Sequence, residues 1–249
     1  MKKIYFICSL LAILIVACKE KSNEEGKEAN ENQIVSDSSA YSKNVDVKDC
    51  PNEETLVLEG ETFKSYTEDI MRGKGVITFT MDINDRLDFL NEDDSVFGEI
   101  VLNEDMPFFT LKMPGKVIAR KVIPNYDFAA FDFDCEGISS DPNYFIIYIN
   151  KEKRKVKKDG IKYTFSTWEE YIKKQHIGLK SCNLIKSGNG AINQKSSNQA
   201  FIVNKINGDE IEITSDKSCL GEDVPFQSIK GKVKWKAGNR LLINFALCN

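Results

Sequence analysis

The stretch Val76–Ile83, VITFTMDI, decides the fold class, because its apolar and polar residues alternate with the period of a β-strand. A half-buried strand places such residues on opposite faces. The apolar residues are Ile77, Phe79, Met81 and Ile83, and the polar residues are Thr78, Thr80 and Asp82. We therefore expect a strand here whose apolar face covers a core.

The same alternation recurs further along the chain. Phe109, Leu111 and Met113 share one face, and Tyr144–Ile149 is a more continuous apolar run that predicts a central strand. Prolines and glycines separate these runs at spacings typical of short antiparallel strands. In the remaining run, Ala129, Phe131, Phe133 and Cys135 alternate with Asp132, Asp134 and Glu136.

One short helix is expected within this β-rich sequence. Thr167 and Glu170 form a capping-box pattern, and Trp168, Tyr171 and Ile172 then share one helical face. This spacing favours burial of Trp168 against a sheet, with a ligand-binding aromatic platform as the alternative.

The C-terminal residues return to the strand pattern. Phe201–Ile213 contains the hairpin-turn dipeptide Asn207-Gly208, and residues 237–239 form a second predicted turn. Val233 and Trp235 are expected to share a face, and Leu241, Ile243, Phe245 and Leu247 to form a last alternating strand. The absence of any long helical pattern predicts an all-β class.

The N-terminus has a different pattern. Met1–Lys3 is basic, Ile4–Val16 is apolar, and Ala17 directly precedes Cys18, so this segment resembles a bacterial lipoprotein signal. A transmembrane helix is the alternative, but the apolar run is shorter than the roughly 20 residues that span a bilayer. The resemblance implies a signal peptide over residues 1–17, cleavage before Cys18, and attachment of diacylglyceryl and palmitate-type chains at Cys18.

Residues 18–50 are expected to form a flexible tether, because Lys19–Asp49 contains few large apolar side chains. Lys19 directly after Cys18 resembles sorting to the outer membrane more than retention in the inner membrane. We therefore expect a lipid-anchored protein of the cell envelope at the outer membrane, with the side of the membrane left open.

Several segments of the folded part resemble uncharacterised bacterial surface proteins with SH3-like β-barrel modules. The resemblance implies two small antiparallel barrel-like modules: residues 51–177, ending in the short helix, and residues 178–249. It further implies that Gly231–Trp235 and the strand that contains Leu241–Ile243 form the final hairpin of the second module. The segments that carry it are residues 127–137, 144–160, 163–172 and 231–245.

Charge and histidine content narrow the function classes. The chain has a formal net charge of -4, which becomes -6 once Lys2 and Lys3 leave with the signal peptide. Nucleic-acid binding normally needs a basic surplus, so we expect no nucleic-acid partner. His176 is the only histidine, which disfavours common zinc sites, and a structural or exposed role is favoured over a catalytic base.

Acidic residues offer a further candidate site. Asp132, Asp134 and Glu136, with Asp127 and Asp141 nearby, would supply oxygen ligands for Ca²⁺ if they converged, but the glycine of the calcium-loop pattern is absent. A solvated acidic face is therefore the favoured interpretation, and we expect no metal. Carboxylates also leave open a surface glycan hydrolase.

The basic segment 151–158 is the strongest binding candidate. A charged hairpin that protects a sheet edge is the favoured interpretation, and an anion-binding site is the functional alternative. As a binding surface, the segment ranks above the acidic strand, because its cations are concentrated in an otherwise acidic chain. They are Lys151, Lys153, Arg154, Lys155, Lys157 and Lys158.

An odd number of cysteines remains after Cys8 leaves and Cys18 is acylated, so at least one thiol is unpaired or intermolecular. Cys135 shares the apolar phase of its strand, which predicts a buried, inert thiol. Pairing of Cys219 with Cys182 or Cys248 is expected within the C-terminal module.

These observations predict a membrane-anchored, non-catalytic binding or scaffolding module for an anionic envelope glycan or an anionic protein partner, with no cofactor and no catalytic residues. The alternatives are the glycan hydrolase and an immunity or inhibitor lipoprotein. The sequence leaves the oligomeric state open.

Overall fold

The structure is a computed structural model that describes residues 50–59, 64–102, 109–124, 128–186, 191–220 and 226–246. The predicted signal peptide, the lipidated Cys18 and the tether up to residue 49 lie outside the described residues, as do Asp127 and Cys248. In the described part of the chain, no helix is long and apolar enough to cross a membrane.

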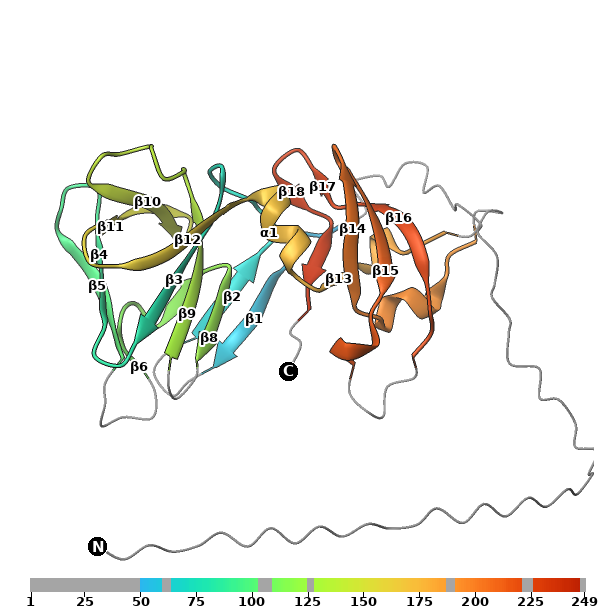
Figure 1. Cartoon of the computed structure of the whole chain (residues 1–249), viewed down its shortest axis with the longest axis horizontal. Helices are drawn as coiled ribbons and strands as arrows, with labels where there is room; N and C mark the ends of the chain where they lie inside the picture. Colours follow the sequence, from blue (N-terminus) through green and yellow to red (C-terminus); the bar gives the residue numbers. More distant parts are fainter. Residues whose placement is uncertain are drawn as a thin grey trace, which may run out of the picture. The chain divides into compact units, whose positions relative to one another are not determined.

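The N-terminal half folds into two sheets (Figure 1). A nine-stranded antiparallel sheet has the order β12-β3-β9-β10-β11-β4-β5-β6, with β8 paired to β9. A three-stranded sheet has the order β1-β2-β7, in which β2 and β7 are parallel. The strands are β1 (Glu54–Glu59), β2 (Lys64–Glu68), β3 (Gly75–Asp82), β4 (Arg86–Leu90), β5 (Val96–Leu102), β6 (Phe109–Lys112), β7 (Lys116–Ile118), β8 (Lys121–Pro124), β9 (Phe128–Cys135), β10 (Tyr144–Ile149), β11 (Glu152–Lys157) and β12 (Lys162–Thr167).

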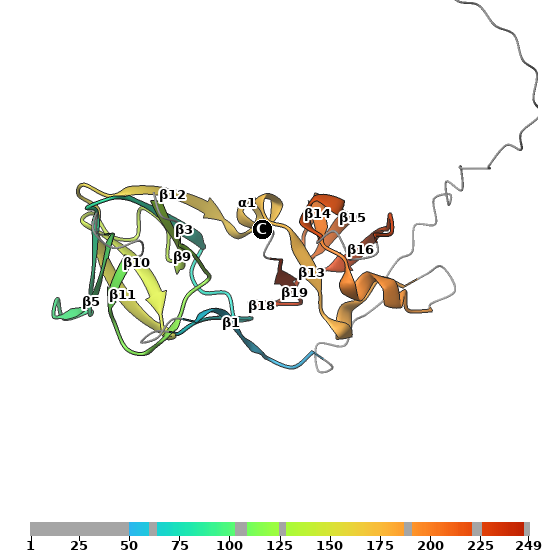
Figure 2. The same cartoon turned by 90° about the horizontal axis from the view of Figure 1, so that it is seen from below.

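The large sheet curves around one apolar core (Figure 2). Phe89 of β4 and Phe133 of β9 lie 5.6 Å apart between ring centroids, although two strands separate them in the sheet. The predicted alternation of β3 is confirmed through Met81, which is buried. Ile83 is instead 40% exposed, because it lies beyond the end of β3 in the turn toward β4.

The basic segment 151–158 contains β11, which lies inside the large sheet and not at its edge. Its neighbour β10 lies between β9 and β11, which confirms the prediction that Tyr144–Ile149 is a central strand. β11 has β10 on one side and β4 on the other, so the interpretation of this segment as protection for a sheet edge is wrong. The physical reason is that Val156 and Arg154 are buried, and of the lysines that alternate with them only Lys153 and Lys157 are exposed.

The predicted helix is confirmed as α1 (Trp168–Lys174). The hydroxyl of Thr167 accepts from the backbone N–H of Glu170, whose carboxylate accepts from the N–H of Thr167 at 2.8 Å. Trp168, Tyr171 and Ile172 are buried in a second core, as their spacing predicted.

That second core lies under an antiparallel sheet of order β16-β15-β14-β13-β19. The predicted hairpin at Asn207-Gly208 is confirmed, with Gly208 at φ +60° in the turn between β14 and β15. Trp235 is buried and its indole N–H donates to the Gly208 carbonyl at 2.9 Å. The elements are β13 (Ile177–Leu179), β14 (Phe201–Asn207), β15 (Glu210–Ser215), β16 (Lys230–Lys234), β17 (Lys236–Ala237), β18 (Arg240–Leu241), β19 (Ile243–Phe245) and the 3₁₀ turns η2 (Ser181–Asn183), η3 (Gln194–Asn198) and η4 (Lys217–Cys219).

The predicted last strand and final hairpin are wrong in detail. The chain breaks at Leu242 into β18, which pairs with β17, and β19, which pairs with β13 rather than with β16. Leu242 is fully buried beside Cys50, which explains the interruption. None of the sheets in the described residues closes into a barrel, so the all-β class is confirmed and the SH3-like form of the modules is not.

The N-terminal half is in contact with the C-terminal sheets and their core. Ile70 forms a β-bridge with Arg240, and Met71 and Val76 from the N-terminal half join the second core. The predicted boundary between residues 177 and 178 stays a prediction.

The cysteines partly follow the expectation. Cys50 and Cys182 form a disulfide across 132 residues, so pairing of Cys182 with Cys219 is wrong. Cys219 is also disulfide-bonded, and Cys248, its other predicted partner, lies outside the described residues. Cys135 is unpaired and buried, as predicted, and burial raises the pKa of its thiol. The spacing of the cysteines in the sequence did not predict this disulfide, because Cys50 and Cys182 come together only in the tertiary structure, where both pack beside Leu242.

Candidate binding surface

The outer face of the β10–β11 hairpin carries a regular array of aromatic, aliphatic and cationic side chains. Antiparallel register places each of three residues of β10 opposite one lysine of β11. The intervening residues, such as Phe145 and Val156, face the core. The cross-strand pairs are Tyr144 with Lys157, Ile146 with Lys155, and Tyr148 with Lys153, and we call these six residues the Tyr–Lys ladder.

Lysines of the ladder also lie over its aromatic rings. The Lys155 ammonium is 5.5 Å from the centroid of the Tyr144 ring, and that of Lys153 is 5.9 Å from the centroid of Tyr148. The negative face of an aromatic ring attracts a cation at such distances. These contacts hold the ammonium groups close to a half-buried aromatic surface.

Two ladder lysines have acidic partners. Lys153 lies 2.9 Å from Glu136, and Lys155 lies 2.9 Å from Asp94. The Tyr148 hydroxyl also donates to Glu136. This hydrogen bond is the largest cause, and the one from Lys153 the next, of a lowered pKa for the Glu136 carboxyl. Lys157 is exposed and has no ion pair with any other described residue. The Lys155 ammonium also donates to the Glu92 carbonyl at 2.6 Å, and its side chain is only 19% exposed. The ladder therefore combines an exposed cation without an ion pair, an exposed lysine paired with Glu136, and a largely covered lysine paired with Asp94.

The other predicted cations lie elsewhere. Arg154 faces inward, with its guanidinium 4.1 Å from the centroid of the Phe97 ring. Lys158 donates to the Ile138 carbonyl at 2.7 Å. Lys151 occupies the hairpin turn. The structure thus brings three of the six predicted binding residues onto one open face and separates the other three from it.

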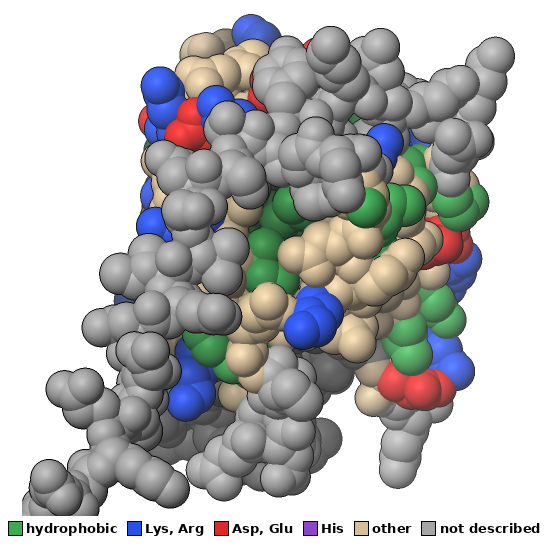
Figure 3. All heavy atoms as spheres, turned by 90° about the vertical axis from the view of Figure 1, so that its right-hand side faces the viewer, with side chains coloured by type: hydrophobic (Ala, Val, Ile, Leu, Met, Phe, Trp, Pro, Cys, Tyr) green, Lys and Arg blue, Asp and Glu red, His purple; other side chains and the backbone are tan. Residues whose placement is uncertain are grey.

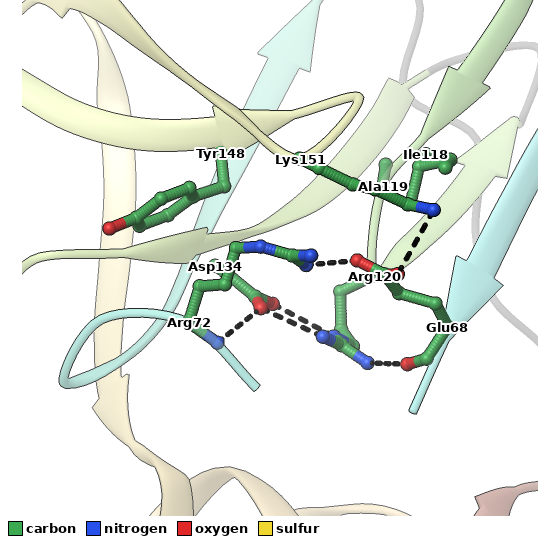
Figure 4. A pocket seen from close by; sticks show the side chains of 8 residues that line it. All are labelled: Glu68, Arg72, Ile118, Ala119, Arg120, Asp134, Tyr148 and Lys151. Carbon is green, nitrogen blue, oxygen red and sulfur yellow. Dashed lines mark hydrogen bonds and ion pairs between the residues drawn. The ribbon is translucent and has the colours of Figure 1, made fainter. Parts of the chain in front are cut away.

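Lys151 lines a cleft at the tip of this hairpin. Its ammonium lies 3.0 Å from Glu54 of β1 and 3.9 Å from Glu68 of β2. The cleft has a volume of about 580 Å³. Figure 4 shows a smaller neighbouring pocket, which shares Glu68, Arg72 and Lys151 with the cleft and is also lined by Tyr148. The residues that line the cleft are Asn52, Glu53, Glu54, Glu68, Asp69, Ile70, Arg72 and Lys151.

Beneath the cleft lies a buried ion pair. The Nε and Nη2 atoms of Arg120 each donate to one oxygen of Asp134, both at 2.8 Å, and the backbone N–H of Arg72 donates to the same carboxylate (Figure 4). Arg120 also donates to backbone carbonyls of Glu68 and Ile70. This network joins the cleft wall to β9.

The interpretation of Asp132 and Asp134 as part of a solvated acidic face is wrong, because both are buried. Asp132 accepts from Thr78 at 2.6 Å and from the Tyr171 hydroxyl at 2.8 Å. Burial raises the pKa of Asp132. Among the described residues, no group of three or more His, Cys, Asp or Glu side chains is placed to hold a metal ion.

His176 pairs with an acid that sequence spacing did not reveal. Its Nε2 lies 2.8 Å from Oδ2 of Asp216, and Ser218 donates to the same carboxylate. These contacts, with His176 first, lower the pKa of Asp216 to about 2. The pair connects the start of β13 to η4, which gives His176 a structural contact.

The C-terminal sheet exposes a different kind of surface. Figure 3, seen from the side of β16, shows hydrophobic side chains beside scattered lysines and arginines. Ile192, Ile202 and Phe226 are among the exposed apolar residues of this part of the chain. Single apolar side chains are ordinary on protein surfaces, so we assign no site to them.

A comparison of the chain with protein families, with curated proteins and with solved structures finds no match.

Proposed function

We propose that this protein is a membrane-anchored envelope lipoprotein whose folded part is a non-catalytic binding module for an anionic glycan or protein partner. The observation that supports it is the Tyr–Lys ladder. We also propose that its two modules are related to SH3-like domains, on the basis of the sequence segments that resemble them.

The geometry of the ladder suits an extended polyanion. Lys153, Lys155 and Lys157 occupy alternate positions of one strand, and such positions repeat about every 7 Å. Partly exposed ion pairs at the surface contribute little, typically up to about 1 kcal/mol, so charged groups of a partner can replace Glu136 and Asp94. The tyrosine rings add apolar contact area beside each charge.

The proposed anchor is Cys18, and the proposed location is the outer membrane. Disulfides persist mainly outside the reducing cytosol, and the bond between Cys50 and Cys182 supports export. Cys18→Ser removes the only proposed acylation site, so the variant should be found as uncleaved precursor or as soluble protein. Unchanged membrane retention of that variant would contradict the anchor.

The binding proposal is tested by replacing the three ladder lysines with glutamine. If each contact with the partner contributes about 0.5 kcal/mol, affinity for a polyanion should fall about tenfold. Binding by the unchanged protein should also weaken steeply with salt. The readout is calorimetric titration with poly-L-glutamate and with oligogalacturonate.

A matched control is available in β16. Lys230, Lys232 and Lys234 also alternate along one strand, and Lys232 is also in an ion pair with a glutamate. Their replacement by glutamine removes the same charge and should leave affinity nearly unchanged. An equal loss in both variants would show that only net charge matters, and would remove the ladder from the account.

A further inference from the structure

The cleft at the tip of the β10–β11 hairpin has features that the ladder alone does not explain. Asn150 and Lys151 form the hairpin turn with φ values of +52° and +71°. Glycine is the usual residue at such a second turn position, because other side chains are strained there. Here a lysine occupies it, and its ammonium lies between carboxylates of β1 and β2.

The hairpin tip is held firmly in this position. The side chain of Asn150 accepts from the N–H of Ile118 at 2.7 Å and donates to the Lys116 carbonyl at 3.0 Å. These bonds fasten the tip to β7. The backbone of Lys151 is thereby held at the cleft wall, from which its ammonium reaches Glu54.

Carboxylates outnumber cations in the lining of the cleft, which has four acidic residues against Arg72 and Lys151. Glu54 accepts from Lys116 and Lys151, which together lower the pKa of its carboxyl, with Lys116 the larger cause. Glu68 pairs with Arg72, and Asp69 pairs with Lys180. Such a lining suits a ligand rich in hydroxyl groups, because each hydroxyl can donate to a carboxylate and accept from a neighbouring cation.

Arg72 connects the cleft to the ladder. Tyr148 is the last aromatic residue of the ladder, and the Arg72 guanidinium of the cleft lies 6.0 Å from the centroid of its ring. The volume of about 580 Å³ lies within the roughly 300–1,000 Å³ typical of small-molecule sites. A chain lying along the ladder would therefore bring its next unit to the cleft.

We infer that the cleft binds one sugar unit of an acidic glycan whose neighbouring units lie along the ladder. This inference rests on the proposed function and narrows it, because it selects a glycan over an acidic protein. In this arrangement, Glu54 accepts from sugar hydroxyls, Lys151 and Arg72 donate to sugar oxygens, and the ladder lysines contact the acidic groups.

The test compares Glu54→Ala with Glu59→Ala in the full folded part of the chain. Both glutamates belong to β1 and both pair with lysine, but only Glu54 lines the cleft. Each variant is titrated with oligogalacturonate, an acidic glycan, and with poly-L-glutamate, an acidic chain without sugar. Thermal melting checks that both variants stay folded.

Glu54→Ala should bind oligogalacturonate at least about tenfold more weakly, through loss of an acceptor for sugar hydroxyls. It should bind poly-L-glutamate as well as the unchanged protein or better, because a negative charge is lost. Glu59→Ala should bind both polymers as the unchanged protein does or better. Loss of affinity for both polymers in Glu54→Ala, or for neither, would overturn the sugar site. Failure of the unchanged protein to bind either polymer would overturn the proposed function itself.

Discussion

Both β9 and β11 place charged residues at alternate positions of a strand, yet the outer face of β9 is buried and that of β11 is open. Asp132 and Asp134 are covered by Tyr171 and Arg120, whereas Lys153 and Lys157 are exposed. The comparison teaches that alternation identifies the core side of a strand but not the surroundings of its other side.

The buried side has the larger energetic consequence. Removing one partner of a buried ion pair leaves an uncompensated charge, which costs about 3–5 kcal/mol. An exposed lysine on β11 carries no comparable penalty. The two faces should therefore respond very differently to the same substitution.

The largest expected effect is that of Asp134→Ala. It leaves the Arg120 guanidinium buried without its carboxylate, and should lower the free energy of unfolding by about 3–5 kcal/mol. Urea denaturation measures this change. Lys157→Ala is the matched control and should change stability by no more than about 0.5 kcal/mol. Similar costs at the two positions would contradict the contrast between the faces.

A smaller, pH-dependent effect is expected at Asp132. Because burial raises its pKa in the folded state, the stability that this group contributes is present below the unfolded pKa and is lost as pH rises through the folded pKa. Asp132→Asn cannot ionise, so its stability relative to the unchanged protein should improve from about pH 3.5 to about pH 7.5. Its cost at the lower pH should be on the order of 1–3 kcal/mol, from disturbed hydrogen bonds to Thr78 and Tyr171.

Urea denaturation at the two pH values measures how the stability difference between Asp132→Asn and the unchanged protein changes with pH. For Asp216→Asn this change should have the opposite sign, because the contact with His176 lowers the pKa of Asp216 to about 2. Its stabilising contribution is present above the unfolded pKa of about 3.9 and is lost as pH falls toward the folded pKa. A constant stability difference for Asp132→Asn over the whole pH range would refute burial of a titrating carboxyl.

The sequence carries the local part of this fold and little of its tertiary part. The alternation of β3, the capping box at Thr167 and the turn at Gly208 all depend on neighbouring residues, and these predictions are confirmed. The partners of Asp134 and Asp132 cannot be predicted in this way, because they come from distant parts of the chain. Arg120, between β7 and β8, donates to Asp134, and Tyr171 of α1 donates to Asp132.

The candidate site divides in the same way. The charge of segment 151–158 is visible in the sequence, and period two predicts that Lys153, Lys155 and Lys157 share a face. The tyrosines opposite them depend on the hairpin register, and the cleft depends on Glu54 and Glu68 of distant strands. Charge alone therefore placed Lys151, Arg154 and Lys158 in the same site as the ladder lysines, whereas the fold separates them from it.

The smallest effect expected is on stability when all three ladder lysines become glutamine. Their ion pairs lie at the surface and are partly exposed, so the free energy of unfolding should change by about 1 kcal/mol or less. Thermal and urea denaturation of this variant measure that change. A loss as large as that of Asp134→Ala would show that these lysines serve the fold rather than a partner.

The most direct test of the central claim is lysine footprinting of the folded part with and without oligogalacturonate, read by mass spectrometry of acetylated lysines. The account predicts that the ligand protects Lys153 and Lys157 on the ladder and leaves Lys230 and Lys232 on β16 as reactive as before. Protection of the β16 lysines with no protection of the ladder would contradict it.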